Sequence, residues 1–558
     1  MKLSDYIFKF LKNYTDSVFL LSGGGIMHLV DSLGKSNLSA YCCHHEQAAV
    51  IAAEGYSRIG HPEKLGVALV TTGPGGTNAI TGVAGAWLDS IPMLVISGQV
   101  KTDNIVPKKQ GVPLVRAIGF QELNIIDLVK PITKYAVMVD DPSQIRYHLE
   151  KAIYLAKSGK PGPVWLDIPL DVQAAEVKIK NLRKFKPLPL SNFRKPKIPM
   201  KIIVDKLKKA KKPLMLVGNG IRLADGVDIL WQVLQKLKIN VASTMFTADD
   251  LVTGEYPYYL GCQGMPGRKA ANYAIDNCDL LLVIGDRLQL TQTSYDYENL
   301  ATQAFKIMVD IDAAELHKKT IQIDLPVQCD AKYFLNELYK QKISLNRWEV
   351  KKDLINPADY QNSSQYLNVY RFWRELSKYP KAYHVATANG MASVTPHQAL
   401  RIKKGQRLIT NAGLGHMGSG LPLAIGVCIA ASKKPVICST GDGSFMLNIQ
   451  ELQTMIHHHL PLKIFIFNND GYYSIRNTHR NYFGKVFAAD PRTGVSFPNF
   501  EKLVKAWGIK YEKISTNKDL NKVKKVMDYK GAIVCELIID PDQPSLPKWR
   551  AGLLREKS

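Results

Sequence analysis

Short apolar runs alternate along the chain with longer stretches in which apolar residues recur every three or four positions. The short runs predict buried β-strands, and the periodic stretches predict amphipathic α-helices. Because strands and helices alternate, successive strands are expected to pair in parallel as βαβ units, which gives an α/β fold. Strands are predicted at residues 18–21, 65–72 and 93–97, at 213–217, 280–284 and 305–309, and at 435–438, 462–467 and 532–538.

Two stretches without this alternation divide the chain into three predicted domains. The first stretch is basic, contains several prolines and runs to about residue 198, and the second, residues 346 to about 365, is polar. Both are interpreted as linkers. The predicted domains are therefore residues 1–172, 199–345 and 366–558, which agrees with the domain count expected for 558 residues.

The composition is that of a globular protein, with 46% hydrophobic and 22% charged residues. No apolar run reaches the roughly 18 residues that a transmembrane helix needs. The N-terminal helix, MKLSDYIFKFLKNY, lacks the apolar core of a signal peptide, and the eight cysteines have no CxxC spacing. These features predict a cytoplasmic protein that has no membrane partner.

The net charge is +24, from 73 basic and 49 acidic residues. Such an excess is typical of a solvated lysine-rich surface, and it also attracts acidic substrates or nucleic acid. Much of it lies in residues 178–212, a predicted linker and helix with little aromatic interleaving and no nucleic-acid-binding motif. Nucleic acid is therefore not an expected partner.

The clearest chemical signal lies in residues 439–475, where a strand, a glycine-rich turn, a helix and a second strand follow one another. The first strand ends at Gly441-Asp442-Gly443, and the second ends at Asn468-Asn469-Asp470-Gly471. Both turns are thus predicted at the carboxyl ends of parallel strands, the edge at which open α/β sheets bind ligands. Asn448 and Glu451 have capping-box spacing and are expected to begin the intervening helix.

These two turns suit a magnesium diphosphate. Gly441 and Gly443 let backbone N–H groups approach phosphate oxygens. Asp442, Asn469 and a carbonyl near Gly471 offer hard oxygen ligands, and Mg²⁺ needs only a few from the protein. Taken alone, Gly-Asp-Gly has the alternative interpretation of a plain glycine-rich turn. The second polar turn, Asn-Asn, strongly disfavours this alternative.

The Gly-Asp-Gly turn followed by Asn-Asn resembles the diphosphate-binding motif of thiamine-diphosphate (ThDP) enzymes. GDGSFMLNIQEL, residues 441–452, is most similar to the acetohydroxyacid (acetolactate) synthase branch. The resemblance covers nearly the whole chain and implies three doubly wound parallel-sheet domains: pyrimidine-binding, central and diphosphate-binding. It also implies ThDP and Mg²⁺ as cofactors, and a homodimer or homotetramer with active sites at the subunit interface.

Glu46 opens a helix that is otherwise almost entirely small and apolar. The purely structural interpretation of Glu46 is a negative charge that stabilises a helix N-terminus. HEQAA followed by AEGYSR, residues 45–49 and 53–58, resembles the family signature of the glutamate that contacts the aminopyrimidine of ThDP. The resemblance therefore makes Glu46 the expected acid–base residue.

The resemblance also assigns residues that contact the cofactor. GLGHMGSGLP, residues 413–422, is similar to a synthase segment in which a glycine carbonyl holds the aminopyrimidine and a methionine wedges beneath the cofactor. These roles pass to Gly415 and Met417, although methionine is also a common core filler. The expected cofactor-binding set is Gly24, Gly25, Glu46, Asn389, Gly390, Gly415, Met417, Gly441, Asp442, Gly443, Ser444, Asn469, Gly471 and Tyr472, with Asp442, Asn469 and Gly471 on the metal.

Phe120, Gln121 and Lys134 match synthase positions that line the substrate side of the cofactor, and the resemblance makes them candidate catalytic residues. A surface lysine at a strand edge is the alternative for Lys134. In the central domain, residues 264–267, 285–287 and 310–312 resemble segments that contact FAD. The Gly218-Asn219-Gly220 turn lacks a third glycine, and LQLTQTS after Arg287 departs from the synthase pattern, so FAD, ADP or no ligand all stay open.

The implied reaction is decarboxylation of a 2-oxo acid, pyruvate, and transfer of the acyl-anion equivalent to an acceptor carbonyl. Thr478 occupies the position of a tryptophan that shapes the acceptor pocket in the synthases, and Arg476 and His479 add cationic character. This departure resembles the related branch of surface-polysaccharide and deoxysugar pathways, whose acceptors can be keto-sugar nucleotides. It predicts an acceptor that is larger and more polar than a second pyruvate. The alternatives are a genuine acetolactate synthase, a non-oxidative 2-oxo acid decarboxylase and a flavin-dependent oxidase.

Overall fold

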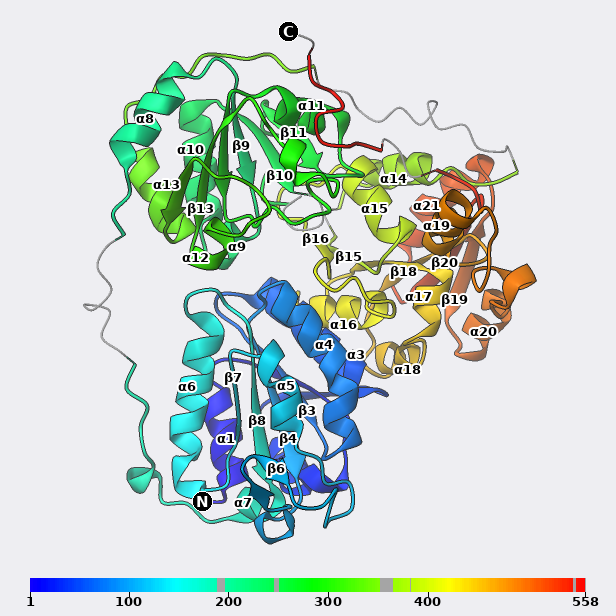
Figure 1. The fold of residues 1–558 in the computed structure, drawn as a ribbon. Helices are drawn as coiled ribbons and strands as arrows, with labels where there is room; N and C mark the ends of the chain where they lie inside the picture. The colour runs from blue at the N-terminus through cyan, green and yellow to red at the C-terminus, as the bar shows by residue number, and fades with distance from the viewer. Residues whose placement is uncertain (188–195, 245–249, 352–364, 382, 545–547, 557–558) are drawn as a thin grey trace.

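The computed structural model describes residues 1–187, 196–244, 250–351, 365–381, 383–544 and 548–556. These residues form three α/β domains, each built on a six-stranded sheet whose strands all run parallel (Figure 1). The predicted fold class is therefore confirmed. Most of the second predicted linker and part of the first lie outside the described residues.

The N-terminal domain has the strand order β2-β1-β3-β4-β8-β7. Buried apolar residues fill β1, β3, β4 and β8, as expected for a sheet covered by helices on both faces. The strands are β1 (Ser17–Leu20), β2 (Ser39–Cys42), β3 (Gly66–Val70), β4 (Met93–Gln99), β7 (Tyr135–Met138) and β8 (Pro163–Pro169). The helices are α1 (Leu3–Leu11), α2 (Met27–Lys35), α3 (Glu46–Gly60), α4 (Pro74–Leu88), α5 (Ile125–Val129), α6 (Ile145–Lys157) and α7 (Leu170–Ala174).

The middle domain has the order β11-β10-β9-β12-β13-β14, so the direction of winding reverses between β9 and β12. Ligands of doubly wound sheets bind at such a switch point. The strands are β9 (Pro213–Val217), β10 (Asn240–Thr244), β11 (Tyr259–Gln263), β12 (Leu280–Ile284), β13 (Phe305–Asp310) and β14 (Leu325–Gln328). The helices are α8 (Met200–Lys209), α9 (Gly220–Leu223), α10 (Val227–Leu237), α11 (Lys269–Asn277), α12 (Ala313–Leu316) and α13 (Ala331–Tyr339).

The C-terminal domain has the order β16-β15-β17-β18-β20-β19, which repeats the winding of the N-terminal sheet. Its switch point lies between β15 and β17. The strands are β15 (Val385–Thr387), β16 (Leu408–Thr410), β17 (Ile437–Gly441), β18 (Lys463–Asn468), β19 (Lys510–Ile514) and β20 (Ile533–Ile538). The helices are α14 (Val369–Lys378), α15 (Met391–Ala399), α16 (Gly420–Ala430), α17 (Asp442–Met446), α18 (Glu451–His457), α19 (Tyr473–Phe483), α20 (Phe500–Ala506) and α21 (Lys522–Asp528).

The N-terminal and C-terminal domains share one apolar core, because α3 packs tightly against α16 (Figure 1). A Cβ atom on Gly55 would lie 2.5 Å from the carbonyl oxygen of Leu423, and one on Gly426 would collide with the carbonyl of Ala52. Glycine at both positions therefore allows the two backbones to approach closely.

The end of the chain departs from the predicted domain boundary. Residues 549–556 were expected in the C-terminal domain, yet they return to the middle domain and pack beside α11 (Figure 1). There the carboxylate of Asp276 accepts hydrogen bonds from the Trp549 indole (3.0 Å) and from the amides of Gly552 and Leu554 (2.8 Å each). Within the described residues no helix is long and apolar enough to cross a bilayer. All eight cysteines are free thiols.

Candidate active site

The Gly-Asp-Gly and Asn-Asn turns meet because β17 and β18 are paired neighbours, with Gly441 opposite Phe467. Asp442, the first residue of α17, is buried, and its Oδ1 accepts a hydrogen bond from the amide of Gly443 (2.7 Å). Its Oδ2 accepts hydrogen bonds from the amides of Asn469 and Gly471 (3.1 Å each). Burial raises the pKa of Asp442 to about 6, so the carboxylate lies in a place where a nearby cation would stabilise its charge.

The second turn supplies a further oxygen that the protein leaves unpaired. The Oδ1 atom of Asn469 is buried and has no hydrogen-bond partner among the described residues. Gly471 has φ +144°, and a side chain there would collide with the carbonyl of Ala489. One carboxylate, one amide oxygen and a turn carbonyl fit Mg²⁺, which fills the rest of its shell with phosphate and water. The described residues contain no cluster of three or more His, Cys, Asp and Glu side chains that would suit another metal.

Met417 and Tyr472 converge on Gly443. A Cβ atom on Gly443 would collide with the Tyr472 ring and would lie 3.2 Å from Cε of Met417. The Oγ atom of Ser444 accepts a hydrogen bond from the amide of Gly418 (2.9 Å), which ties the methionine loop to the start of α17. Residues assigned to the diphosphate and residues assigned to the rings of ThDP are therefore neighbours in space, as a single bound ThDP requires.

Asn389 and Gly415 also come together. The Nδ2 atom of Asn389 donates a hydrogen bond to the carbonyl of Gly415 (3.2 Å), the carbonyl that was expected to hold the aminopyrimidine. Gly415 has φ +62°, and a Cβ atom built on it meets no heavy atom within 4 Å, so the backbone borders open space. His416, which follows Gly415 and was not singled out from the sequence, has both ring nitrogens buried and unpaired among the described residues, and burial lowers its pKa to about 4.

Glu46 is the first residue of α3 and is 6% exposed. Its Oε2 accepts a hydrogen bond from Nδ2 of Asn78 on α4 (3.0 Å). The neighbouring Gln47 accepts one from Asn448 (3.1 Å), whose Nδ2 also donates to the carbonyl of Gly418 (2.8 Å). Within one chain, the Glu46 end of α3 therefore abuts the segment between α17 and α18, close to the methionine loop.

The predicted capping box at Asn448 and Glu451 is wrong. The helix α18 begins only at Glu451, and the side chain of Asn448 contacts Gln47 and Gly418 instead of a helix amide. Glu451 accepts hydrogen bonds from the amide of His44 (2.9 Å) and from Oγ1 of Thr454 (2.6 Å). The contacts of Asn448 and Glu451 therefore join the C-terminal domain to the N-terminal domain. A local sequence pattern does not show that the partners of these side chains come from another domain.

The two predicted glycines after β1 differ from each other. A Cβ atom on Gly25 would collide with Thr72, and the Gly25 carbonyl accepts a hydrogen bond from Gln173 (2.8 Å), so Gly25 is required for packing. A Cβ atom on Gly24 would meet no heavy atom within 4 Å. Of the pair, Gly24 alone borders open space that a ligand could fill.

The structure does not bring Lys134 to this site. Lys134 lies at the amino end of β7, whereas Glu46 follows the carboxyl end of β2, so the two are at opposite edges of the sheet. Its Nζ donates a hydrogen bond to the carbonyl of Ser158 (2.5 Å), and burial lowers its pKa to about 8. Within the single chain Lys134 is therefore remote from Glu46, and its expected place on the substrate side stays a prediction.

Phe120 and Gln121 lie in the loop before α5. Phe120 is 89% exposed, and Gln121 is exposed with a left-handed φ of +62°. The Gln121 carbonyl abuts Gly73, which begins the turn into α4. Neither side chain is enclosed near Asp442 within the single chain, so their role in the site remains a proposal.

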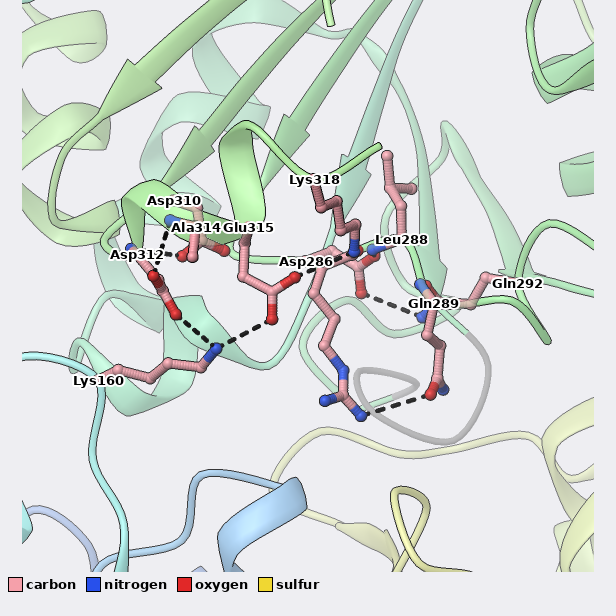
Figure 2. A network of polar contacts seen from close by, with 11 residues as sticks. Lys160, Asp286, Leu288, Gln289, Gln292, Asp310, Asp312, Ala314, Glu315 and Lys318 are labelled. Atoms are coloured by element: carbon pink, nitrogen blue, oxygen red, sulfur yellow. Dashed lines mark hydrogen bonds and ion pairs between the residues drawn. The ribbon is translucent and has the colours of Figure 1, made fainter. Parts of the chain in front are cut away.

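A cavity of about 390 Å³ lies between the N-terminal and middle domains, at the switch point of the middle sheet. Gly220, Arg287 and Asp310 line it from one side, and His61 and Lys160 from the other. Lys160 donates hydrogen bonds to Asp312 and Glu315 (3.0 Å each; Figure 2). Burial raises the pKa of Asp310 to about 6. Among the described residues, the segments 285–287 and 310–311 line this cavity and the segment 264–267 does not.

Comparison with known proteins places these motifs in one family. Residues 1–124 match the N-terminal TPP binding domain of thiamine pyrophosphate enzymes, residues 200–338 match the central domain, and residues 388–537 match the C-terminal TPP binding domain.

Relatives match over nearly the whole chain. The acetolactate synthase large subunit of Cyanidium caldarium is 31% identical, over 97% of this chain and 94% of the relative. The acetolactate synthase isozyme 2 large subunit of Escherichia coli (strain K12) is 34% identical, over 90% of this chain and 89% of the relative. The probable acetolactate synthase large subunit of Methanococcus aeolicus is 31% identical, over 94% and 89%. With three matching domains and relatives of this coverage, the chain belongs to the acetolactate synthase-like family of thiamine diphosphate-dependent enzymes.

Proposed function

We propose that this protein is a ThDP- and Mg²⁺-dependent carboligase that decarboxylates pyruvate and joins the remaining two-carbon unit to the carbonyl group of a second 2-oxo acid. The observation that supports the proposal is the meeting of the buried Asp442 carboxylate with the Asn469–Gly471 turn, in which the buried Oδ1 of Asn469 has no hydrogen-bond partner among the described residues. The names of the relatives support acetolactate as the product.

Bound ThDP would supply the electron sink that accepts the electrons released by decarboxylation. Asp442, Asn469 and the Gly471 carbonyl would hold Mg²⁺ and thereby the diphosphate. Gly415 and Met417 would orient the rings, with Asn389 fixing the Gly415 carbonyl. Glu46, anchored through Oε2 by Asn78, would hold a proton on its carboxyl group beside the pyrimidine ring and exchange it there during the reaction.

The acceptor predicted from the sequence does not receive support. Arg476 was expected to add charge to the acceptor pocket, yet it is buried and donates hydrogen bonds to backbone carbonyls. A second 2-oxo acid is therefore the favoured acceptor. Product analysis tests this choice, with pyruvate alone, with pyruvate and 2-oxobutyrate, and with pyruvate and a keto-sugar nucleotide. Acetolactate from pyruvate alone is expected, whereas a product formed only with the sugar nucleotide would contradict the proposal.

The role of Glu46 is tested by Glu46→Gln, which keeps the hydrogen bond from Asn78 but cannot exchange a proton. Loss of a general acid–base group should lower kcat by roughly 10²–10⁴-fold. Binding of ThDP, measured by calorimetry, should change far less. Glu63→Gln, at an exposed carboxylate just after α3, is the matched control and should keep the wild-type rate. A wild-type rate in Glu46→Gln would remove Glu46 from the mechanism.

The cavity between the N-terminal and middle domains is proposed to bind the adenosine diphosphate portion of a nucleotide, as part of FAD or as ADP. Its position at the switch point and its glycine turns at residues 218–220 and 285 support this assignment. Denaturing the purified protein and identifying the released nucleotide separates the two ligands, since only FAD gives a flavin spectrum. Oxygen consumption with pyruvate separates a flavin-dependent oxidase from a carboligase.

Self-association as a homodimer or homotetramer is proposed from the family resemblance. In the single chain, the Glu46 end of α3 already lies beside the segment between α17 and α18. Mixing two inactive variants, Glu46→Gln and Asp442→Ala, shows whether one active site uses one chain or two. Recovered activity in the mixture means that each site combines residues of two subunits.

A further inference from the structure

We infer that Arg476 is a positioning residue for the magnesium site: its guanidinium holds the Asn469–Gly471 turn in the conformation that presents oxygen ligands to the metal. The inference deepens the proposed function and depends on it. It replaces the earlier expectation that Arg476 faces the acceptor.

Arg476 lies at the end of the first turn of α19 and is 2% exposed. Its Nη2 donates hydrogen bonds to the carbonyls of Asn469 (2.9 Å) and Pro541 (3.0 Å), and its Nη1 donates one to the carbonyl of Asp470 (2.9 Å). Only Nε lacks a partner among the described residues. A planar guanidinium presents its donors in a fixed fork, so it fixes the orientation of both carbonyls of the turn at once.

The backbone of this turn needs such support. Asp470 has φ +55° and Gly471 has φ +144°, so two successive residues lie outside the region that ordinary side chains prefer. Conformations of this kind persist only where the surroundings enforce them. A Cβ atom on Gly471 would also lie 2.6 Å from Nη1 of Arg476, so the glycine and the arginine fit each other.

The turn is held from two sides. Its amides, from Asn469 and Gly471, donate to Oδ2 of Asp442 (3.1 Å each), and its carbonyls accept from Arg476. With the backbone fixed in this way, the side-chain Oδ1 of Asn469 is buried and finds no partner within the described part of the chain, so it is available as a metal ligand. The hydrogen bond to Pro541, just after β20, anchors the guanidinium to a third segment of the domain.

Arg476→Met and Arg476→Lys test the inference, with Arg480→Met as the matched control. Arg480 lies one turn further along α19, is exposed and pairs with exposed Asp542, so its loss should have little effect. Groups that orient metal ligands typically change metal affinity by about 10–100-fold when they are removed. The apparent Kd of Mg²⁺ in the presence of ThDP and without substrate, measured by isothermal titration calorimetry, should rise by that factor in Arg476→Met.

Arg476→Lys keeps the charge but loses the fork, and we expect an intermediate rise in the Kd of Mg²⁺. Saturating Mg²⁺ should restore most of kcat in Arg476→Lys. Hydrogen exchange of the amides of residues 469–471 in the metal-free protein should accelerate in both variants and stay unchanged in Arg480→Met.

Two outcomes would overturn the inference. One is wild-type Mg²⁺ affinity in Arg476→Lys together with unchanged exchange of the turn amides. The other is a uniform loss of stability in Arg476→Lys with no change in metal affinity, which would make Arg476 a general structural residue. If the wild-type protein itself shows no Mg²⁺-dependent binding of ThDP, the proposed function fails instead, so the two failures are distinguishable.

Discussion

Asp442 and Asp167 are two buried carboxyl groups whose hydrogen-bond partners differ. Asp442 accepts three backbone hydrogen bonds, one of them from Asn469, whose amide oxygen is unpaired among the described residues, and this arrangement suits a cation. Asp167, at the carboxyl half of β8, accepts hydrogen bonds from Ser97 (2.5 Å) and Gln99 (3.0 Å). Burial raises its pKa to about 7, and neither of these partners carries a positive charge.

This elevated pKa predicts a pH-dependent stability. The folded protein holds the Asp167 proton more tightly than the unfolded chain, so the stabilisation is full below the ordinary pKa of 3.8 and is lost as pH rises towards about 7. Asp167→Asn mimics the protonated form and should remove that dependence. Relative to Asp167→Asn, wild type should lose roughly 2–3 kcal/mol of stability between about pH 5 and pH 8.

Melting temperatures of wild type and Asp167→Asn across this pH range provide the measurement. Asp141→Asn is a suitable control, because Asp141 is exposed and its pKa is lowered by hydrogen bonds from Ser143. A constant difference between wild type and Asp167→Asn at all pH values would show that Asp167 does not titrate in this range.

Among the elements, the contact between α3 and α16 decides where Glu46 lies. Both helices are rich in small residues, and their backbones touch at Gly55 and Gly426. Small residues at a helix crossing reduce the distance between the axes, so a larger side chain would push α3 and its first residue, Glu46, away from the segment between α17 and α18.

Gly426→Ala should therefore destabilise the protein. The new Cβ atom would collide with the backbone carbonyl of Ala52, which cannot move without shifting α3. Overpacking of a tight core typically costs about 1–3 kcal/mol. We expect a lower melting temperature and weaker binding of ThDP in this variant.

Gly34→Ala provides the control for that substitution. Gly34 lies near the end of α2, is exposed and has no atom within 4 Å of an added Cβ atom. Alanine is the better helix former, so Gly34→Ala should keep or slightly raise the melting temperature. An equal effect of the two substitutions would mean that the α3–α16 contact is not critical.

For the whole molecule, the cavity between the N-terminal and middle domains is lined by residues of both, so the proposed nucleotide would contact both domains. Lys160 of the N-terminal domain contacts Asp312 and Glu315 of the middle domain, and the neighbouring Asp310 faces the cavity (Figure 2). Asp310 is the last residue of β13, and an acid at the carboxyl end of such a strand is placed to accept a hydrogen bond from a ribose hydroxyl.

Asp310→Ala should lower the affinity for ADP. Hydrogen bonds to charged groups contribute about 1.5–3 kcal/mol, which corresponds to roughly 10–100-fold in Kd. Calorimetric titration of the purified, nucleotide-free protein with ADP measures the change. Asp324→Ala, at an exposed carboxylate just before β14, serves as the control. Equal affinities in wild type and Asp310→Ala would contradict the assignment of this cavity.

The sequence by itself determined the α/β class, the parallel strands and the pairing of the Gly-Asp-Gly and Asn-Asn turns. These features are readable because they depend on local patterns: apolar runs define strands, and parallel strands place their following turns at one edge. The position of Glu46 at the start of a helix was predicted for the same reason and is confirmed, whereas its catalytic role rests on the family resemblance and stays a prediction.

The tertiary structure alone decided which partners several polar side chains contact and where the end of the chain packs, since both depend on which distant segments meet. Arg476 faces the carbonyls of the Asn469–Gly471 turn, Glu451 faces the N-terminal domain, and Lys134 lies at the opposite edge of the sheet from Glu46. The last described residues pack on the middle domain through Asp276. A one-dimensional pattern reports whether a side chain is charged or apolar, but hydrogen bonds between distant segments are set by the packing of whole domains.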